Sequence, residues 1–248
     1  MQRVALPAGG DAPARKLNTD ARLAWKRLAD VAVGSVTLVV LAPALLLVAM
    51  AIWAEDGLPV LFHQKRLGRD GREFTLLKFR KFRNRHTLGD CPLTLKHDPR
   101  LTKVGNLLER MKIDELPQFW NVLKGDMSLV GPRPETPYFA DCFKGAYRDV
   151  LRFKPGIFGP SQAVFRDEST LHHVGSDPEQ FYRDVLFPLK ARIDLAYFPH
   201  ANARLDLRWT LRCILAVLGR RFLPGRGADH VQERVESCLH LLAGETKR

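Results

Sequence analysis

The sequence KIDELPQFWNVLKGDMSLVGPRPE, at positions 112–135, contains two adjacent carboxylates, Asp114 and Glu115, shortly before a proline. Proline is tolerated in the first turn of a helix, where its missing N–H would have no partner, and glycine favours a helix end. We therefore predict a short helix over Leu116 to Lys124, ended by Gly125. Because the N-terminus of a helix favours negative charge, we expect both carboxylates to stay ionised beside a phosphate site.

Arg133 lies in the turn GPRP that follows this predicted helix. The two prolines restrict the turn, and a planar guanidinium can donate two parallel hydrogen bonds to phosphate oxygens. Acidic residues also cap many helices, so the four residues Asp-Glu-Leu-Pro by themselves leave a capping role and a catalytic role open.

The longer run DELPQFWNVLKGDMSLVGPRPE closely resembles the signature of the bacterial sugar transferases that start glycan assembly, the monotopic phosphoglycosyl transferases. The resemblance extends over roughly residues 26–169, through KRLADVAVG, KFR and KPGI, and more loosely into the C-terminal part. The chain departs from the family pattern after KFR and again before the carboxylates. Lys81 and Phe82 replace the usual Ser or Thr and Met after KFR, and Glu109 stands where the family commonly has a basic residue.

The resemblance implies transfer of a phosphosugar from a UDP-sugar to a membrane polyprenol (undecaprenyl) phosphate, with release of UMP. Asp114 would attack the β-phosphorus and form a covalent phosphosugar-aspartate, and Glu115 would bind Mg²⁺. Magnesium suits a site where carboxylate and phosphate oxygens meet. The basic residues expected at the substrate phosphates are Arg133, Lys112, Arg110, Lys78 and Arg80.

The segment from Val31 to Ala54 contains no charged residue and is long enough to cross a hydrocarbon core of about 30 Å as a helix. Both of its flanks are strongly basic. Because cytoplasmic flanks carry excess positive charge, a helix that enters and leaves on one face satisfies both flanks, whereas a straight span does not. Pro43 removes a backbone hydrogen bond in the middle of the segment, so we predict a re-entrant helix. The family also bends at this proline, although Ala42 replaces its usual serine.

These features divide the chain into a flexible tail at 1–20, a membrane helix region at 21–56, a cytoplasmic transferase domain at 57–223 and a C-terminal extension at 224–248. Lys26, Arg27 and Asp30 share helical spacing near the lipid headgroups, where the two cations could pair with lipid phosphate. The extension carries no chemical motif, and we expect it to be dispensable for catalysis.

We predict an α+β fold: a mostly helical, membrane-associated single domain with a small hairpin, the re-entrant helix and an amphipathic interfacial helix. Runs of strand character at Leu58–His63 and Phe74–Phe79 flank the turn RLGRDGRE. The sequence before the carboxylates predicts a helix with an apolar face of Val104, Leu107, Leu108 and Met111.

Two further segments leave alternatives open. The run from Asp206 to Phe222 mixes Trp209 and aliphatic residues with arginines, which predicts a helix that either lies on the membrane or packs on the protein core. In the glycine- and proline-rich segment 154–169, Arg166, Asp167 and Glu168 either contact nucleotide or sugar or form a surface turn.

A formal net charge of +12 over 248 residues indicates an anionic partner: nucleic acid, an acidic membrane or a phosphorylated substrate. No nucleic-acid module is visible, so we do not expect nucleic acid. The four cysteines are far apart and lack CxxC spacing, which argues against a zinc site and for a reducing compartment. The expected location is the cytoplasmic face of the bacterial inner membrane, and a homodimer is compatible with the family.

A non-enzymatic, basic, membrane-anchored binding protein is the alternative interpretation. Net charge and the apolar segment permit it, but it leaves the motifs DELP and GPRP unexplained. The identity of the sugar and of the glycan pathway is not encoded in any motif that we recognise.

Overall fold

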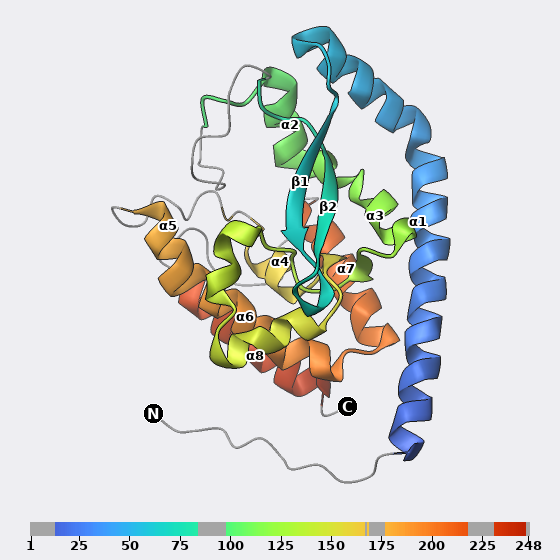
Figure 1. Ribbon diagram of the computed structural model, residues 1–248, viewed down its shortest axis with the longest axis vertical. Helices are drawn as coiled ribbons and strands as arrows, with labels where there is room; N and C mark the ends of the chain where they lie inside the picture. The colour runs from blue at the N-terminus through green and yellow to red at the C-terminus, as the bar shows by residue number, and fades with distance from the viewer. Residues whose placement is uncertain (1–12, 84–97, 167, 169–176, 218–230, 247–248) are drawn as a thin grey trace.

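The computed structural model describes residues 13–83, 98–166, 168, 177–217 and 231–246 (Figure 1). The described chain is mostly helical with two small two-stranded sheets, which agrees with the α+β prediction. The helices and strands are α1 (Pro13–Asp56), β1 (Leu61–Leu67), β2 (Glu73–Phe79), α2 (Lys103–Met111), α3 (Gln118–Lys124), β3 (Ser128–Val130), β4 (Gly156–Phe158), α4 (Pro160–Val164), α5 (Pro178–Phe181), α6 (Phe187–Tyr197), α7 (Ala203–Val217) and α8 (Val231–Thr246).

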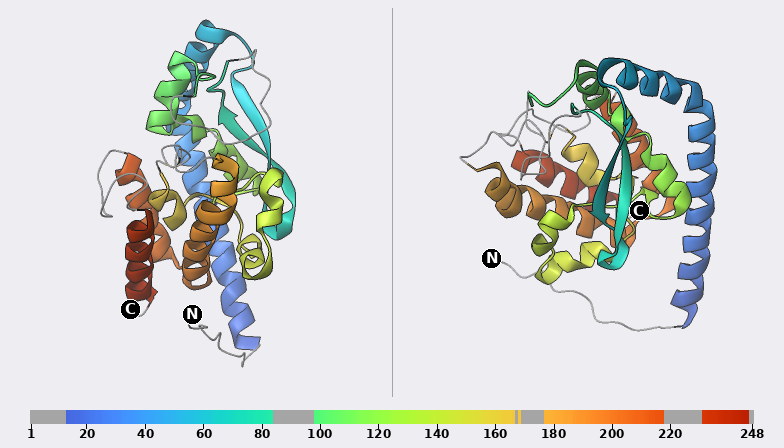
Figure 2. Two further views of the ribbon diagram at one scale, coloured as in Figure 1. Left: turned by 90° about the vertical axis from the view of Figure 1, so that its left-hand side faces the viewer. Right: turned by 45° about the horizontal axis from the view of Figure 1, so that its top comes forward.

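Helix α1 runs along one side of the domain and then turns across its top (Figures 1 and 2). It begins at Pro13, within the predicted tail, and contains Pro43, whose missing N–H accounts for a bend in a helix. Residues 1–12 of the tail lie outside the described part. Among the described residues, Ala24–Asp56 is the segment long and apolar enough to cross a membrane. Large apolar side chains along it remain exposed, as expected for a helix that faces lipid.

The polar residues near the start of the apolar segment contact the rest of the protein. Arg27 donates two hydrogen bonds, of 2.5 and 2.6 Å, to the carbonyl oxygens of Val122 and Leu123 at the end of α3. Asp30 accepts a hydrogen bond of 2.9 Å from the N–H of Leu129, and Lys26 pairs with a carboxylate of α7. These side chains therefore have partners within the protein, and their contacts fix α1 to the domain.

We expect Arg27→Ala to lower the free energy of unfolding by about 2 kcal/mol, because two carbonyl groups at a helix end lose a charged donor. Thermal unfolding of both proteins in one detergent measures the effect. Arg152→Ala is the control, because Arg152 lies exposed on the surface and its ion pair among the described residues is with the exposed Asp149. Equal stability of Arg27→Ala and the control would contradict a stabilising role for the hydrogen bonds from Arg27 to the end of α3.

The predicted hairpin is present; its second strand agrees with the prediction to within one residue, and its first strand is shifted along the chain. Strands β1 and β2 pair antiparallel, with Leu61 opposite Phe79 and Leu67 opposite Glu73. The first strand therefore begins later than the predicted Leu58 and runs into the expected turn. The turn places Asp70 at a φ of 59° and Gly71 at 75°, a backbone region that glycine and aspartate tolerate better than most residues.

The main core lies around α6, with α4 and α8 packed against α6 and with α7 packed against α4. Val235, Cys238 and Leu242 of α8 are buried in this core, so the described part of the predicted C-terminal extension belongs to the domain. The hairpin and α3 form a smaller cluster, and Ile52 of α1 joins Phe79 of β2 in another.

Helix α7 combines both of the predicted alternatives. Leu205, Trp209 and Cys213 are buried in the core, as expected for a helix that packs on the protein. The opposite side leaves large apolar residues exposed: Leu207, Leu211, Ile214 and Leu215. The last part of the predicted helix, including Arg220 and Arg221, lies outside the described residues.

Candidate active site

Asp114 and Glu115 lie in a single helical turn, Ile113–Glu115, between α2 and α3. Helix α3 begins at Gln118, two residues later than the predicted start at Leu116. The carboxylates therefore lie before the helix and not at its N-terminus. A left-handed residue, Lys112 with a φ of 57°, ends α2 and redirects the chain into this turn. The predicted end at Gly125 is confirmed, with a φ of 92° that glycine accommodates without strain.

Glu115 is held by two cations. Oε1 of Glu115 lies 3.0 Å from Nζ of Lys78 and accepts a hydrogen bond of 2.8 Å from Nη2 of Arg133. Burial opposes ionisation of Glu115, but the charges of Arg133 and Lys78 outweigh it and hold the pKa of this carboxyl well below its usual range. Glu115 is therefore a carboxylate throughout the physiological range.

The pKa values of the two cations shift in opposite directions, because burial outweighs the charge of Glu115 at Lys78 and the reverse holds at Arg133. Burial lowers the pKa of Lys78 to about 8, although the neighbouring Glu115 works against this shift. The charge of Glu115 raises the pKa of Arg133, which stays a cation. A fixed guanidinium and a lysine that still carries most of its charge at neutral pH therefore lie side by side.

Asp114 differs from its neighbour. Its residue is only 3% exposed, and its Oδ1 has no hydrogen-bond partner among the residues that the structure describes. Burial raises the pKa of Asp114, a shift that Lys78 opposes and Glu115 increases. The expectation that both carboxylates stay ionised is thus met by Glu115, whereas Asp114 is the carboxyl of the pair that is harder to ionise.

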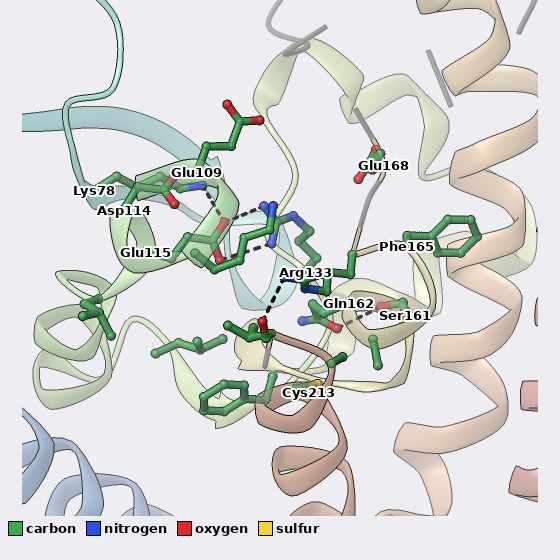
Figure 3. A pocket seen from close by; sticks show the side chains of 18 of the residues that line it. Lys78, Glu109, Asp114, Glu115, Arg133, Ser161, Gln162, Phe165, Glu168 and Cys213 are labelled. Carbon is green, nitrogen blue, oxygen red and sulfur yellow. Dashed lines mark hydrogen bonds and ion pairs between the residues drawn. The ribbon is translucent and has the colours of Figure 1, made fainter. Parts of the chain in front are cut away.

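A cavity of about 520 Å³ contains this group (Figure 3). Lys78, Asp114 and Glu115 lie on one side in Figure 3, with Arg133 between them and Glu168. The cavity also reaches the apolar face of the domain, where Val33 and Thr37 of α1 line it. The basic side chains in its lining are Arg66, Lys78, Lys81, Lys112, Arg133, Arg166 and Lys190.

Two of the expected phosphate ligands do not line the cavity. Arg80 donates hydrogen bonds of 3.0 and 2.7 Å to the carbonyl oxygens of Asp56 and Gly57, where it closes the end of α1. Arg110 is likewise absent from the lining, and its carbonyl oxygen accepts a bond from Arg166. The structure brings together Lys78, Lys112 and Arg133 from the predicted set and leaves these two arginines aside.

The turn that holds Arg133 is positioned by close packing of two glycines. Strands β3 and β4 run parallel and bring Gly131 against Gly156. A Cβ atom on Gly131 would lie only 2.2 Å from the carbonyl oxygen of Lys154. Only glycine fits there, and this contact explains why the GPRP turn and the KPGI segment lie together.

Sequence reasoning assigned no catalytic or binding role to several charged residues of the cavity. Arg66 comes from β1 and donates a bond of 2.9 Å to the carbonyl oxygen of Pro134, beside Arg133. Lys81 departs from the family motif, yet it lines the cavity. Lys190 of α6 stood in no motif, and no local pattern could have identified it because its partners are distant in sequence.

Two carboxylate oxygens of the cavity are the donor atoms that could bind a magnesium ion. Oε2 of Glu115 has only a long contact of 3.5 Å, to Arg133, so it retains lone pairs, and Oδ1 of Asp114 has no described partner. No group of three or more His, Cys, Asp or Glu side chains among the described residues could hold a metal ion. Magnesium commonly uses one or two carboxylates and takes its other ligands from substrate and water, so this donor set is sufficient.

The sequence of this chain is similar to those of a known protein family. The family described as "Bacterial sugar transferase" matches residues 21–220. An Aeromonas hydrophila UDP-N-acetylgalactosamine-undecaprenyl-phosphate N-acetylgalactosaminephosphotransferase is 34% identical over 204 residues, covering 79% of this chain and 45% of that protein. An undecaprenyl-phosphate glucose phosphotransferase of Komagataeibacter xylinus is 46% identical over 190 residues, covering 74% of this chain and 34% of that protein.

A third relative is a UDP-glucose:undecaprenyl-phosphate glucose-1-phosphate transferase of Caulobacter vibrioides, 39% identical over 164 residues, with coverage of 65% of this chain and 60% of that protein. The chain thus spans less than two thirds of the length of each of these three relatives. The family match covers α1, the hairpin, the carboxylate pair and the cavity. By its sequence and by this match, the chain belongs to the bacterial sugar transferase family.

Proposed function

We propose that this protein transfers a phosphosugar from a UDP-sugar to a membrane polyprenol phosphate and releases UMP. The observation that carries the proposal is the Asp114 carboxyl, which is buried without a described partner beside Glu115, Lys78 and Arg133 in one cavity. A nucleophile, fixed cations and space for a substrate are what phosphoryl transfer requires. Three relatives whose names specify undecaprenyl-phosphate sugar phosphotransferases support this assignment.

In the first step, an oxygen of Asp114 attacks the β-phosphorus of the UDP-sugar. The bond from this phosphorus to the bridging oxygen breaks, and UMP leaves with that oxygen and the electron pair. In the second step, a phosphate oxygen of the polyprenol phosphate attacks the same phosphorus, and Asp114 leaves as a carboxylate. Splitting the transfer in this way predicts ping-pong kinetics.

The cations of the cavity stabilise the charge that develops in both steps. Arg133 presents a planar guanidinium whose orientation is fixed by Glu115, and Lys78 lies against the same carboxylate. Lys112 lines the cavity directly before the carboxylate turn. Such fixed donors stabilise a transition state more than mobile water does, because they need no reorganisation during the reaction.

The proposed acceptor explains the position of the cavity beside α1. A polyprenol phosphate keeps its tail in the bilayer, so the nucleophile must lie at the depth of the headgroups. Val33 and Thr37 of the apolar helix line the same cavity as Asp114, which supports access for a lipid phosphate from the membrane side. A re-entrant α1, bent at Pro43, and the exposed apolar side of α7 would hold the domain on the cytoplasmic face of the inner membrane.

Bound magnesium would supply positive charge to the phosphate oxygens and to the buried carboxyls. We assign Glu115 as its protein ligand, through Oε2. We expect chelation of divalent ions to stop turnover, and Glu115→Gln to raise the magnesium concentration for half-maximal activity at least about tenfold. Titration of UMP release with magnesium measures this. Glu179→Gln, outside the cavity, is the control. An unchanged magnesium dependence in Glu115→Gln would remove Glu115 from this role.

The direct test combines the purified protein with UDP-sugars and undecaprenyl phosphate and follows the release of UMP. The proposed function requires UMP and a lipid-linked phosphosugar with at least one UDP-sugar. A basic membrane-anchored binding protein would bind anionic lipid or nucleotide and release no UMP. A screen of several UDP-sugars in the same assay also identifies the donor.

A further inference from the structure

A second group of polar residues lines the cavity, in addition to the carboxylate pair and its cations. We call this surface the polar wall and define it as Glu135, Thr136, Glu168, Tyr182 and Lys190, all of which line the cavity. Its centre is Lys190, whose Nζ lies 2.7 Å from Oε1 of Glu168 and 3.8 Å from Oε1 of Glu135. The ammonium also contacts the hydroxyl of Tyr182 at 3.3 Å. Glu168 lies across Arg133 from the carboxylate pair in Figure 3.

The composition of the polar wall does not suit phosphate. Two carboxylates share the ammonium of Lys190, and carboxylates repel the oxygens of a diphosphate. Carboxylate oxygens are strong hydrogen-bond acceptors, and each retains lone pairs after it accepts one bond from a lysine. They therefore suit a neutral ligand that is rich in hydroxyl donors.

Thr136 provides an independent sign that a ligand completes this surface. The residue is only 5% exposed, and its hydroxyl oxygen is buried without a hydrogen-bond partner among the residues that the structure describes. An unsatisfied hydroxyl in such a place costs free energy, so a polar group of a ligand in the cavity would relieve it.

The neighbours of Arg133 indicate which part of a UDP-sugar would lie at the polar wall. Arg133 binds Glu115 directly and interacts electrostatically with Glu168 and Glu135 as well. A β-phosphate held at Arg133 for attack by Asp114 carries the sugar on its own oxygen. The sugar ring therefore extends from Arg133 over the neighbouring surface, and the polar wall is the hydroxyl-binding part of that surface.

We propose that the polar wall is the sugar subsite, where Glu135 and Glu168 accept hydrogen bonds from sugar hydroxyls and thereby select the sugar of the donor. Lys190 and Tyr182 are positioning residues that hold the two carboxylates. This inference rests on the proposed transfer from a UDP-sugar and adds to it the residues that discriminate between sugars. Relatives of this chain carry names with different sugars, N-acetylgalactosamine, glucose and galactose, so a discriminating surface is needed in the family.

The test is Glu168→Gln, which keeps the shape of the side chain and loses its charge. We measure kcat/KM for UDP-glucose, UDP-galactose, UDP-N-acetylglucosamine and UDP-N-acetylgalactosamine. The expected result is a change of at least about tenfold in the ratio between the best donor and its epimer, because hydrogen bonds to a charged acceptor are lost for one sugar more than for the other. Glu135→Gln is the second variant and should change the ratio in the same assay.

Glu179→Gln is the matched control, because Glu179 also contacts a tyrosine hydroxyl and a cation, Tyr138 and Arg183, but does not line the cavity. Its donor ratios should equal those of the wild type. If Glu168 and Glu135 bind the uracil or only stabilise the fold, their variants lower kcat/KM by one common factor for all four donors, which would overturn the proposal.

Donors that lack one sugar hydroxyl identify which hydroxyl each carboxylate binds. If a carboxylate of the polar wall accepts a bond from one hydroxyl, removing that hydroxyl from the donor makes the donor insensitive to the Gln variant, so the two effects are not additive. Additive effects at every hydroxyl for both variants would overturn the proposal. Failure of the proposed function is a separate outcome, because the wild type would then release no UMP from any donor.

Discussion

Asp114→Asn is expected to abolish transfer, with a loss of at least about a thousandfold in kcat. The amide has no negative charge and cannot form the acyl phosphate with the β-phosphorus, while its size and burial stay the same. UMP release and phosphosugar transfer, measured with the donor identified by the UDP-sugar screen, test this directly. The control is Asp149→Asn, a change at an exposed carboxylate that pairs with the exposed Arg152.

Trapping of the intermediate separates a covalent role from a merely electrostatic one. The wild type, incubated with UDP-sugar but without lipid acceptor, should gain the mass of one phosphosugar, and a peptide containing Asp114 should carry it. Asp114→Asn should gain none. An Asn variant that is free of wild-type protein and still turns over would exclude the covalent mechanism.

Arg133→Lys is expected to lower kcat/KM by about a hundredfold or more, although it keeps a positive charge. Lysine cannot reproduce the planar fork that faces both Glu115 and the proposed β-phosphate, and removing one fixed donor from an anionic transition state costs about 10²–10³ in rate. The same change also loosens Glu115, because its Oε1 loses its shortest bond, of 2.8 Å. Steady-state kinetics with varied UDP-sugar measures the loss.

The matched control is Arg183→Lys, since Arg183 also pairs with two carboxylates, Asp141 and Glu179, yet lies outside the cavity lining. The control should keep its kcat/KM, and thermal unfolding of both variants should reveal any loss of folded protein. If Arg133→Lys is as active as the control, a phosphate contact through the guanidinium fork is excluded.

Sequence patterns predicted the secondary-structure elements that are determined by residues close together in the chain. The hairpin follows from strand character on both sides of a glycine-rich turn, and Gly125 ends α3 because a left-handed residue is needed there. The start of α3 was missed. Lys112 adopts a left-handed conformation that is unusual for lysine, and the single turn after it separates the carboxylates from the helix. No residue pattern signals such a break.

The site was predictable only where its residues are contiguous or belong to a recognisable motif. Asp114, Glu115 and Arg133 stand within one motif, and Lys78 came from the KFR motif of the hairpin. Arg80, in the same motif, comes after the end of β2 and binds the end of α1 instead of lining the cavity. The membership of a residue in a motif therefore did not determine its surroundings.

The sequence by itself determined the family, the carboxylate pair and its arginine, and the apolar helix, because each of these is written in consecutive residues. The tertiary structure decided what distant polar residues do. Arg27 could face lipid or protein, and only the arrival of the end of α3 beside it provides carbonyl partners. Likewise, Lys190 and Glu168 form part of the cavity because folding brings α6 against the segment after α4. A charged side chain that is removed from water needs a partner that offsets its lost solvation, and the packing of the elements determines which partner lies within reach.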